Sequence, residues 1–209
     1  MRGANGVDRA VEAVASCVGH DGVLVFLASL TDQAGADRNS VHAMTLGAEG
    51  NWDEPVVLSR QGSRPARDLN LLRGPSGEIF ALWHEQSDDG GSRVRGVESQ
   101  DGGRSWDSLP TLAPGGSITG FSGVVGLDGR VHIAFERWDA DGKSSRLKLA
   151  TLALAWSTVQ PVADSIDAFD AVIVSANWDC IDLVFFGSLR AAGAAPKLQS
   201  FNAAVPLTL

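Results

Sequence analysis

The chain has 209 residues, of which 44% are hydrophobic and 20% charged, so it can bury a large core as one or two domains. Its formal net charge is -8. An excess of acidic groups disfavours binding to nucleic-acid phosphates and to anionic membrane surfaces, since both need clustered Lys and Arg. We therefore expect neither a nucleic-acid partner nor a membrane partner.

The start of the chain and its two cysteines carry no targeting or ligand pattern. Residues 1–10 are polar and lack the apolar core of a signal peptide, and no apolar run approaches the length of a membrane span. Cys17 and Cys180 lack the spacing of a metal site, and we interpret them as buried free thiols. The sequence predicts a cytoplasmic protein without a cofactor or a bound metal.

A short turn followed by an apolar run occurs four times along the chain. Gly22, Gly77, Gly129 and Asp179 mark the turns, at intervals of 55, 52 and 50 residues. The runs that follow are nearly continuous in their hydrophobicity, which is typical of strands buried on both faces. The chain is therefore built from four similar units.

A second landmark occurs about thirty residues after each of these turns. It is an aromatic residue followed by proline and a short apolar run, and it begins at Trp52, Trp106 and Trp156, with Phe201 in a weaker fourth copy. Residues 145–156 have a helix-like pattern, but we interpret them as a third strand because they align with the third strand of the second unit.

Each unit is interpreted as four short strands, which in the second unit span residues 68–73, 78–85, 93–99 and 109–112. Four-stranded sheets that are buried on both faces and repeat at this interval indicate radially stacked blades. We predict an all-β fold, a β-propeller of four four-stranded antiparallel blades, forming a single domain over residues 1–209. The blades are expected at about residues 11–58, 64–112, 118–163 and 166–209.

Residues 99–106, with the sequence Ser-Gln-Asp-Gly-Gly-Arg-Ser-Trp, resemble the Asp-box, or bacterial neuraminidase repeat. Asp101 can accept backbone N–H groups in its own turn, the two glycines permit positive φ, and Trp106 can pack between strands. The first unit keeps only Thr45 and Trp52 of this motif. In such families the motif lies between the third and fourth strands, on the face opposite the active site, so the resemblance implies a structural role.

The resemblance suggests a sialidase mechanism. Sialidases use a Tyr nucleophile paired with a Glu, a carboxylate as acid, and three Arg that bind the substrate carboxylate. This chain contains no Tyr, and Arg64-Pro65 is only a fragment of the family's Arg-Ile-Pro element. Four units are also fewer than the six blades of that family. We therefore expect a sialidase-like propeller without sialidase chemistry.

The face opposite the Asp-box carries the candidate site residues. Asp68 and Asp170 are expected to begin innermost strands, where Arg64 and Arg67 lie close to Asp68 in the sequence. In a closed ring of four blades the two carboxylates would face each other and could bind a cation or act as acid and base. The alternative is that each Asp caps a turn or pairs with a neighbouring Arg.

The far ends of the second strands provide further candidates. His84 and Glu136 occupy equivalent positions on adjacent predicted blades, and a His near a carboxylate can be a tuned acid/base pair. The alternative is a structural hydrogen bond or salt bridge between blades. Glu85, Arg137 and Trp138 follow them, and Trp138 could stack on a sugar ring or pack on the blade edge.

We expect a binding propeller for a carbohydrate or another small molecule, with Arg64, Arg67, Glu85, Arg137 and Trp138 as ligand-binding residues. The alternative is an enzyme that uses Asp68, Asp170, His84 and Glu136 as acid and base. A second alternative is a protein-interaction scaffold. The blades are expected either to close as a ring of four or to pair with a second chain in a larger ring, as a homodimer.

Overall fold

The structure is a computed structural model of the chain. It describes residues 9–19, 22–32, 39–60, 66–86, 91–112, 117–138, 145–153, 155–156, 160–163, 172–176, 180–187 and 199–206. Within these ranges all regular secondary structure is β-strand, and there is no helix long and apolar enough to cross a membrane. The all-β prediction is confirmed for this part of the chain.

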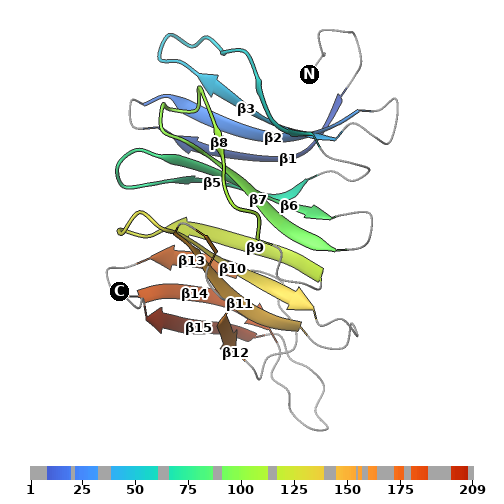
Figure 1. The fold of residues 1–209 in the computed structure, drawn as a ribbon, viewed down its shortest axis with the longest axis vertical. Coiled ribbons are helices and arrows are strands. Elements are labelled where there is room, and N and C mark those ends of the chain that lie inside the picture. The colour runs from blue at the N-terminus through green and yellow to red at the C-terminus, as the bar shows by residue number, and fades with distance from the viewer. Residues whose placement is uncertain are drawn as a thin grey trace. The chain divides into compact units, whose positions relative to one another are not determined.

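The strands form four antiparallel sheets in chain order (Figure 1). The first sheet contains β1 (Arg9–Val18), β2 (Leu24–Asp32), β3 (Ser40–Leu46) and β4 (Val56–Arg60). The second contains β5 (Arg67–Arg73), β6 (Ile79–Gln86), β7 (Ser92–Ser99) and β8 (Asp107–Ser108). The third contains β9 (Ser117–Val125), β10 (Val131–Trp138), β11 (Ser145–Leu152) and β12 (Gln160–Ala163). The fourth contains β13 (Val172–Ala176), β14 (Cys180–Gly187) and β15 (Gln199–Pro206).

The chain divides into two compact units, Met1–Ala113 and Pro114–Leu209. The first unit contains the first and second sheets, and the second unit contains the third and fourth. Closure of the sheets into one ring and their union in one domain stay predictions.

The order and pairing of strands follow the predicted repeat, with one difference in the second sheet. Predicted strand 109–112 is shorter and displaced: β8 is Asp107–Ser108, and Leu112 pairs with Val94 only as an isolated bridge. Pro110 lies between them and has no N–H group to donate, which explains the interrupted ladder. Residues 145–152 form β11, so the strand interpretation of this segment is confirmed.

The fourth unit departs from the aromatic landmark. Phe201 lies within β15 and pairs with Phe185 of β14, whereas Trp52, Trp106 and Trp156 all follow the third strand of their sheet. Equating Phe201 with these tryptophans was therefore wrong. An aromatic residue is as favourable inside a strand as after one, so the single residue gave no information on register.

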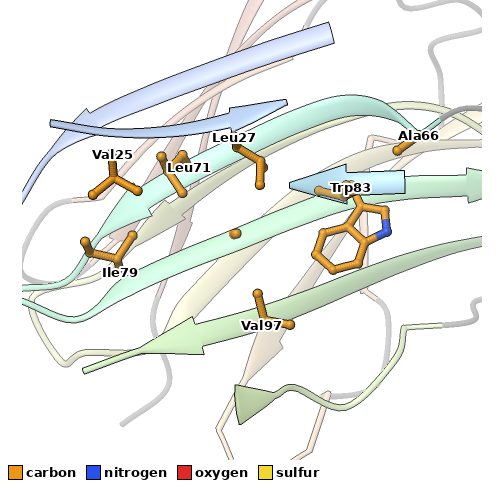
Figure 2. Packing of buried hydrophobic residues seen from close by; sticks show 9 residues of the cluster. Val25, Leu27, Ala66, Leu71, Ile79, Trp83 and Val97 are labelled. Atoms are coloured by element: carbon orange, nitrogen blue, oxygen red, sulfur yellow. The ribbon is translucent and has the colours of Figure 1, made fainter. Parts of the chain in front are cut away.

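The core of the first unit lies between its two sheets (Figure 2). Trp83 of β6 is 1% exposed and belongs to one cluster with Val25 and Leu27 of β2. Side chains of this kind stabilise a fold by about 1.5–3 kcal/mol each when fully buried. The nearly continuous hydrophobic runs noted in the sequence are thus explained by packing between sheets.

Candidate functional site

A β-bulge interrupts the first strand of each of the first three sheets, always at the same end. The shifts in pairing lie between Val11 and Ala13 in β1, between Arg67 and Asn70 in β5, and opposite Glu136 and Arg137 in β9. Each bulge thus lies beside the end of the second strand, where candidate residues were predicted. Bulges redirect side chains and are frequent next to active sites.

In β5 the bulge places Asp68 beside His84. Asp68 has a φ of 50°, a conformation that L-residues other than Asn and Asp seldom adopt, and its Oδ2 lies 3.5 Å from His84 Nδ1. His84 is only 8% exposed, and its Nε2 atom is buried without a hydrogen-bond partner among the described residues. The imidazole therefore has a carboxylate on one side and an unused nitrogen on the other.

In β9 the bulge lies beside Glu136 in the same way. Thr119 lies within the bulge, and its hydroxyl donates to Glu136 Oε2. Glu136 pairs with Gly120 as His84 pairs with Arg67, and its side chain is also buried. His84 and Glu136 belong to different units, so their predicted pairing stays a prediction.

Glu85 makes a different set of contacts, on the face of the second sheet that meets the first. Its carboxylate accepts hydrogen bonds from Ser59 Oγ at 3.3 Å, Trp83 Nε1 at 3.0 Å and Arg93 Nε at 2.8 Å, and Arg95 Nη1 lies 3.5 Å away. The residue is 4% exposed. A buried carboxylate needs such partners, so Glu85 links two sheets, and its role in ligand binding stays a prediction.

Most of the buried polar atoms that have no partner among the described residues lie at this same end of their sheets, and His132 Nε2 at the turn end of the third sheet is an exception. In the first unit they include Ser29 Oγ, Thr31 Oγ1 and Ser92 Oγ besides His84 Nε2, and in the second unit Arg137 Nε and Trp138 Nε1. All lie in the last residues of a second strand or the first of a third. Since buried polar groups are normally paired, this end of the first three sheets has hydrogen-bonding capacity that the described residues do not use.

The turn at the opposite end of the second sheet is closed by several side-chain hydrogen bonds. In residues 99–106, hereafter the Ser99–Trp106 turn, Asp101 Oδ1 accepts from the N–H groups of Arg104 and Ser105 and from Ser99 Oγ. Ser105 Oγ donates to Asp101 Oδ2 at 2.6 Å, and Trp106 Nε1 donates to Gly103 O. Burial alone would raise the pKa of Asp101, but these hydrogen bonds outweigh it and lower the pKa to about 2.

The first sheet forms a related turn with different residues. Thr45 Oγ1 donates to Asp53 Oδ2, and the Asp53 N–H group donates to Thr45 O. Gly50 adopts a φ of 79° within the turn. The motif that looks degraded in the sequence therefore retains a Thr–Asp contact, because Asp53 after Trp52 replaces an aspartate inside the turn.

A second His–Asp pair lies at the turn end of the third sheet. His132 is fully buried, its Nδ1 is 2.8 Å from Thr151 Oγ1, and its Nε2 is 3.7 Å from Asp128 Oδ1. Burial lowers the pKa of His132, and the nearby Asp128 carboxylate opposes this only in part. His132 therefore lies at the end of its sheet away from the bulge.

The structure places some predicted site residues and leaves others outside its description. Arg64 and Asp170 lie outside the described residues, so the Asp68–Asp170 pairing stays a prediction. Arg67 is exposed at the start of β5. Among the described residues no three His, Cys, Asp or Glu side chains are grouped as metal ligands, and Cys17 and Cys180 are half-buried.

Sequence reasoning missed three residues at this end: Thr119, Arg93 and Arg95. The alternation of Arg93 and Arg95 at positions predicted for a third strand was a signal that both face the same side. Thr119 had no such signal, because a bulge changes which side chain points toward the neighbouring strand.

No protein-family model and no curated protein sequence matches the chain. Solved structures do match. A protein of unknown function from Dyadobacter fermentans is 17% identical, with a TM-score of 0.58 over 92% of this chain and 66% of that chain. The GH93 α-L-arabinofuranosidase of Fusarium graminearum is 14% identical, with a TM-score of 0.60 over 93% and 62%. Trypanosoma rangeli sialidase is 10% identical, with a TM-score of 0.58 over 98% and 40%.

The chain spans about two thirds or less of the length of these proteins. At these identities the likeness concerns the fold and not the chemistry. The four antiparallel sheets and these matches together give the chain a sialidase-like propeller fold.

Proposed function

We propose that the chain is a carbohydrate-binding propeller and that its ligand binds at the bulged end of the sheets. The observation that carries this proposal is that buried polar atoms at that end have no hydrogen-bond partner among the described residues. They are His84 Nε2 in the second sheet and, in the other unit, Arg137 Nε and Trp138 Nε1 in the third sheet, and each sheet is considered by itself. Sugar hydroxyls both donate and accept hydrogen bonds, so they suit a mixed set of donors and acceptors. Trp138 adds an apolar ring of the kind on which a sugar can stack.

The same proposal assigns the Ser99–Trp106 turn as an Asp-box with a structural role. Its carboxylate is already bonded within the turn, and the β6–β7 pairing sets it at the opposite end of the sheet from His84. The chain contains no Tyr, so the function proposed does not involve sialidase chemistry. The related folds include carbohydrate-active enzymes of two kinds, which supports a carbohydrate ligand.

Binding is tested by titrating the protein with arabinobiose, with sialyllactose and with a panel of neutral oligosaccharides by calorimetry. For the sugar that the panel identifies, Asp68→Asn is expected to weaken binding at the second sheet and Trp138→Ala to weaken binding at the third. The matched control is Asp128→Asn, which alters the other His–Asp pair at the turn end and is expected to leave affinity unchanged. Equal losses in Asp68→Asn and Asp128→Asn, or no binding to any sugar, would contradict the proposal.

An enzyme is the second candidate, favoured by the contact between Asp68 and His84. A carboxylate near Nδ1 favours the tautomer with its proton on Nδ1, which leaves Nε2 free to accept a proton from a water or sugar hydroxyl. Aryl glycosides and arabinan oligosaccharides test for hydrolysis. If the pair is catalytic, His84→Gln is expected to lower kcat by about 10²–10⁴-fold. Binding without measurable turnover would instead leave the binding function alone.

Assembly is a further part of the proposal, since the sheets are expected either to close as four blades or to pair with a second chain. Sedimentation equilibrium distinguishes the two, because the chain mass is 21.9 kDa. A monomer is required for the pairing of Asp68 with Asp170 across one ring. A stable dimer would favour the larger ring and would remove that pairing.

A further inference from the structure

Two arginines on β7 lie beside the buried carboxylate of Glu85 and remain accessible. Arg93 Nε donates to Glu85 Oε2 at 2.8 Å, and Arg95 Nη1 lies 3.5 Å from Glu85 Oε1. The arginine side chains are 44% and 42% exposed, whereas that of Glu85 is 4% exposed. One carboxylate therefore positions two guanidinium groups that both reach solvent.

Strand pairing directs both arginines to one face. Glu85 is opposite Arg93 and Trp83 is opposite Arg95 across the β6–β7 pair. Residues two apart on a strand, and residues directly opposite each other, share a face of the sheet. Ser59 of β4 reaches the same carboxylate, so the arginine pair lies where the second sheet meets the first.

The hydrogen-bonding capacity of the pair is mostly unused. Each guanidinium carries five N–H donors, and Glu85 is the only acceptor of either arginine among the described residues. Two positive charges share one negative charge, which leaves an excess of one positive charge. Glu85 Oε1 also accepts from Ser59 and Trp83, so part of the acceptor capacity of this carboxylate is used by groups other than the arginines.

We propose that Arg93 and Arg95 form a binding site for an oxyanion, a carboxylate, sulfate or phosphate group, with Glu85 as its positioning residue. Planar guanidinium forks match such oxyanions in pairs of hydrogen bonds. Their fixation by Glu85 lowers the entropy cost of ordering two long side chains when the anion binds. This site lies on the third strand of its sheet, on the face turned toward the first sheet, and is separate from Asp68 and His84. It goes beyond the carbohydrate function proposed above.

The test is an NMR titration of the ¹⁵N-labelled full chain that follows the arginine Nε–Hε signals at constant ionic strength. The probes are sulfate, phosphate, acetate and glucuronate, with glucose as the neutral comparison for glucuronate. Saturable shifts of Arg93 and Arg95 are expected with oxyanions and not with glucose. Arg93→Lys and Arg95→Lys retain the positive charge beside Glu85 but lose the fork, and each is expected to weaken binding about tenfold or more.

Arg104→Lys is the matched control, because Arg104 is an exposed arginine in the Ser99–Trp106 turn at the other end of the sheet. It is expected to leave oxyanion affinity unchanged. Absence of saturable shifts with every oxyanion would overturn the proposal. So would an equal loss in Arg104→Lys, which would show attraction by surface charge alone.

Discussion

The second sheet carries an aspartate at each end, and the two are placed in opposite ways. In the Ser99–Trp106 turn, Gly102 and Gly103 take the positive φ values, so Asp101 is free of strain and both its oxygens accept hydrogen bonds. In the β5 bulge, Asp68 itself takes the positive φ, and its carboxylate has one long contact, to His84. In the turn, the carboxylate of Asp101 is used for local hydrogen bonds that stabilise the fold. In the bulge, the carboxylate of Asp68 stays available for other partners, while its backbone conformation is strained, which is typical of functional positions.

The largest expected effect comes from Gly103→Ala. Gly103 has a φ of 93°, and an added Cβ would lie 3.1 Å from Thr45 Cγ2 and 3.3 Å from both Val25 methyl groups. Backbone strain and a clash with the first sheet add, so we expect a loss of about 2–3 kcal/mol in the free energy of unfolding. Urea denaturation measures it.

Gly50→Ala is the matched control, since Gly50 has a φ of 79° with nothing within 4 Å of the added Cβ. It is expected to cost only the backbone component, about 1–2 kcal/mol. Equal losses in the two variants would show that contact with the first sheet adds nothing to the role of the Ser99–Trp106 turn.

Asp101→Asn is expected to lower stability by about 1 kcal/mol while leaving ligand affinity intact. The amide keeps one oxygen for the N–H groups of Arg104 and Ser105 but replaces the Oδ2 acceptor of Ser105 Oγ by an N–H₂ donor. Denaturation and sugar titration of the same variant give the two readouts. A loss of affinity with no loss of stability would reverse the roles assigned to the two ends.

The difference in stability between the wild type and Asp101→Asn depends on pH through the pKa of Asp101, which folding lowers from 3.8 to about 2. A lowered folded-state pKa stabilises the protein above the unfolded-state value, and that contribution is lost as pH falls toward the folded-state value. The stability advantage of the wild type over Asp101→Asn is therefore expected to be constant above about pH 5 and to shrink between about pH 4 and pH 2. Urea curves of both proteins at a series of pH values measure it. An advantage that stays constant down to pH 2 would show that the carboxylate charge does not matter.

Asp68→Gly gives the smallest expected change in stability, and unlike the other variants it is not expected to destabilise the protein. Glycine removes the strain at a φ of 50°, so we expect a change between zero and a gain of about 1 kcal/mol, together with loss of ligand binding. Asp68→Asn, which tolerates the same backbone, separates the effect of charge from that of strain. A clear loss of stability in Asp68→Gly would mean that the contact with His84 is structural, like those of Asp101.

Several parts of the site were accessible from the sequence. His84 and Glu136 were placed at equivalent strand ends because the repeat interval and the period of strands are sufficient for that alignment. The contrast between the two ends of the second sheet also followed, from the resemblance of residues 99–106 to an Asp-box. In each case the information is local or periodic, and strand alternation transmits it along the sheet.

Other parts depended on contacts between distant segments. Glu85 was predicted as a ligand-binding residue. In the structure its carboxylate accepts hydrogen bonds from Ser59, Trp83 and Arg93, and Ser59 comes from another sheet. The strain on Asp68 and the contact of Thr119 with Glu136 arise from bulges, which add one residue to a strand without any marked sequence signal.

By itself, the sequence determined the all-β repeat, the order of the strands and the chemistry of the Ser99–Trp106 turn, because turn residues and hydrophobic periodicity act over a few residues. Only the tertiary structure decided which polar side chains are already paired and which remain unused. Hydrogen bonding is a pairwise property of groups that the fold brings together, and Asp101, Glu85 and Asp68 have the same carboxylate with three different sets of partners.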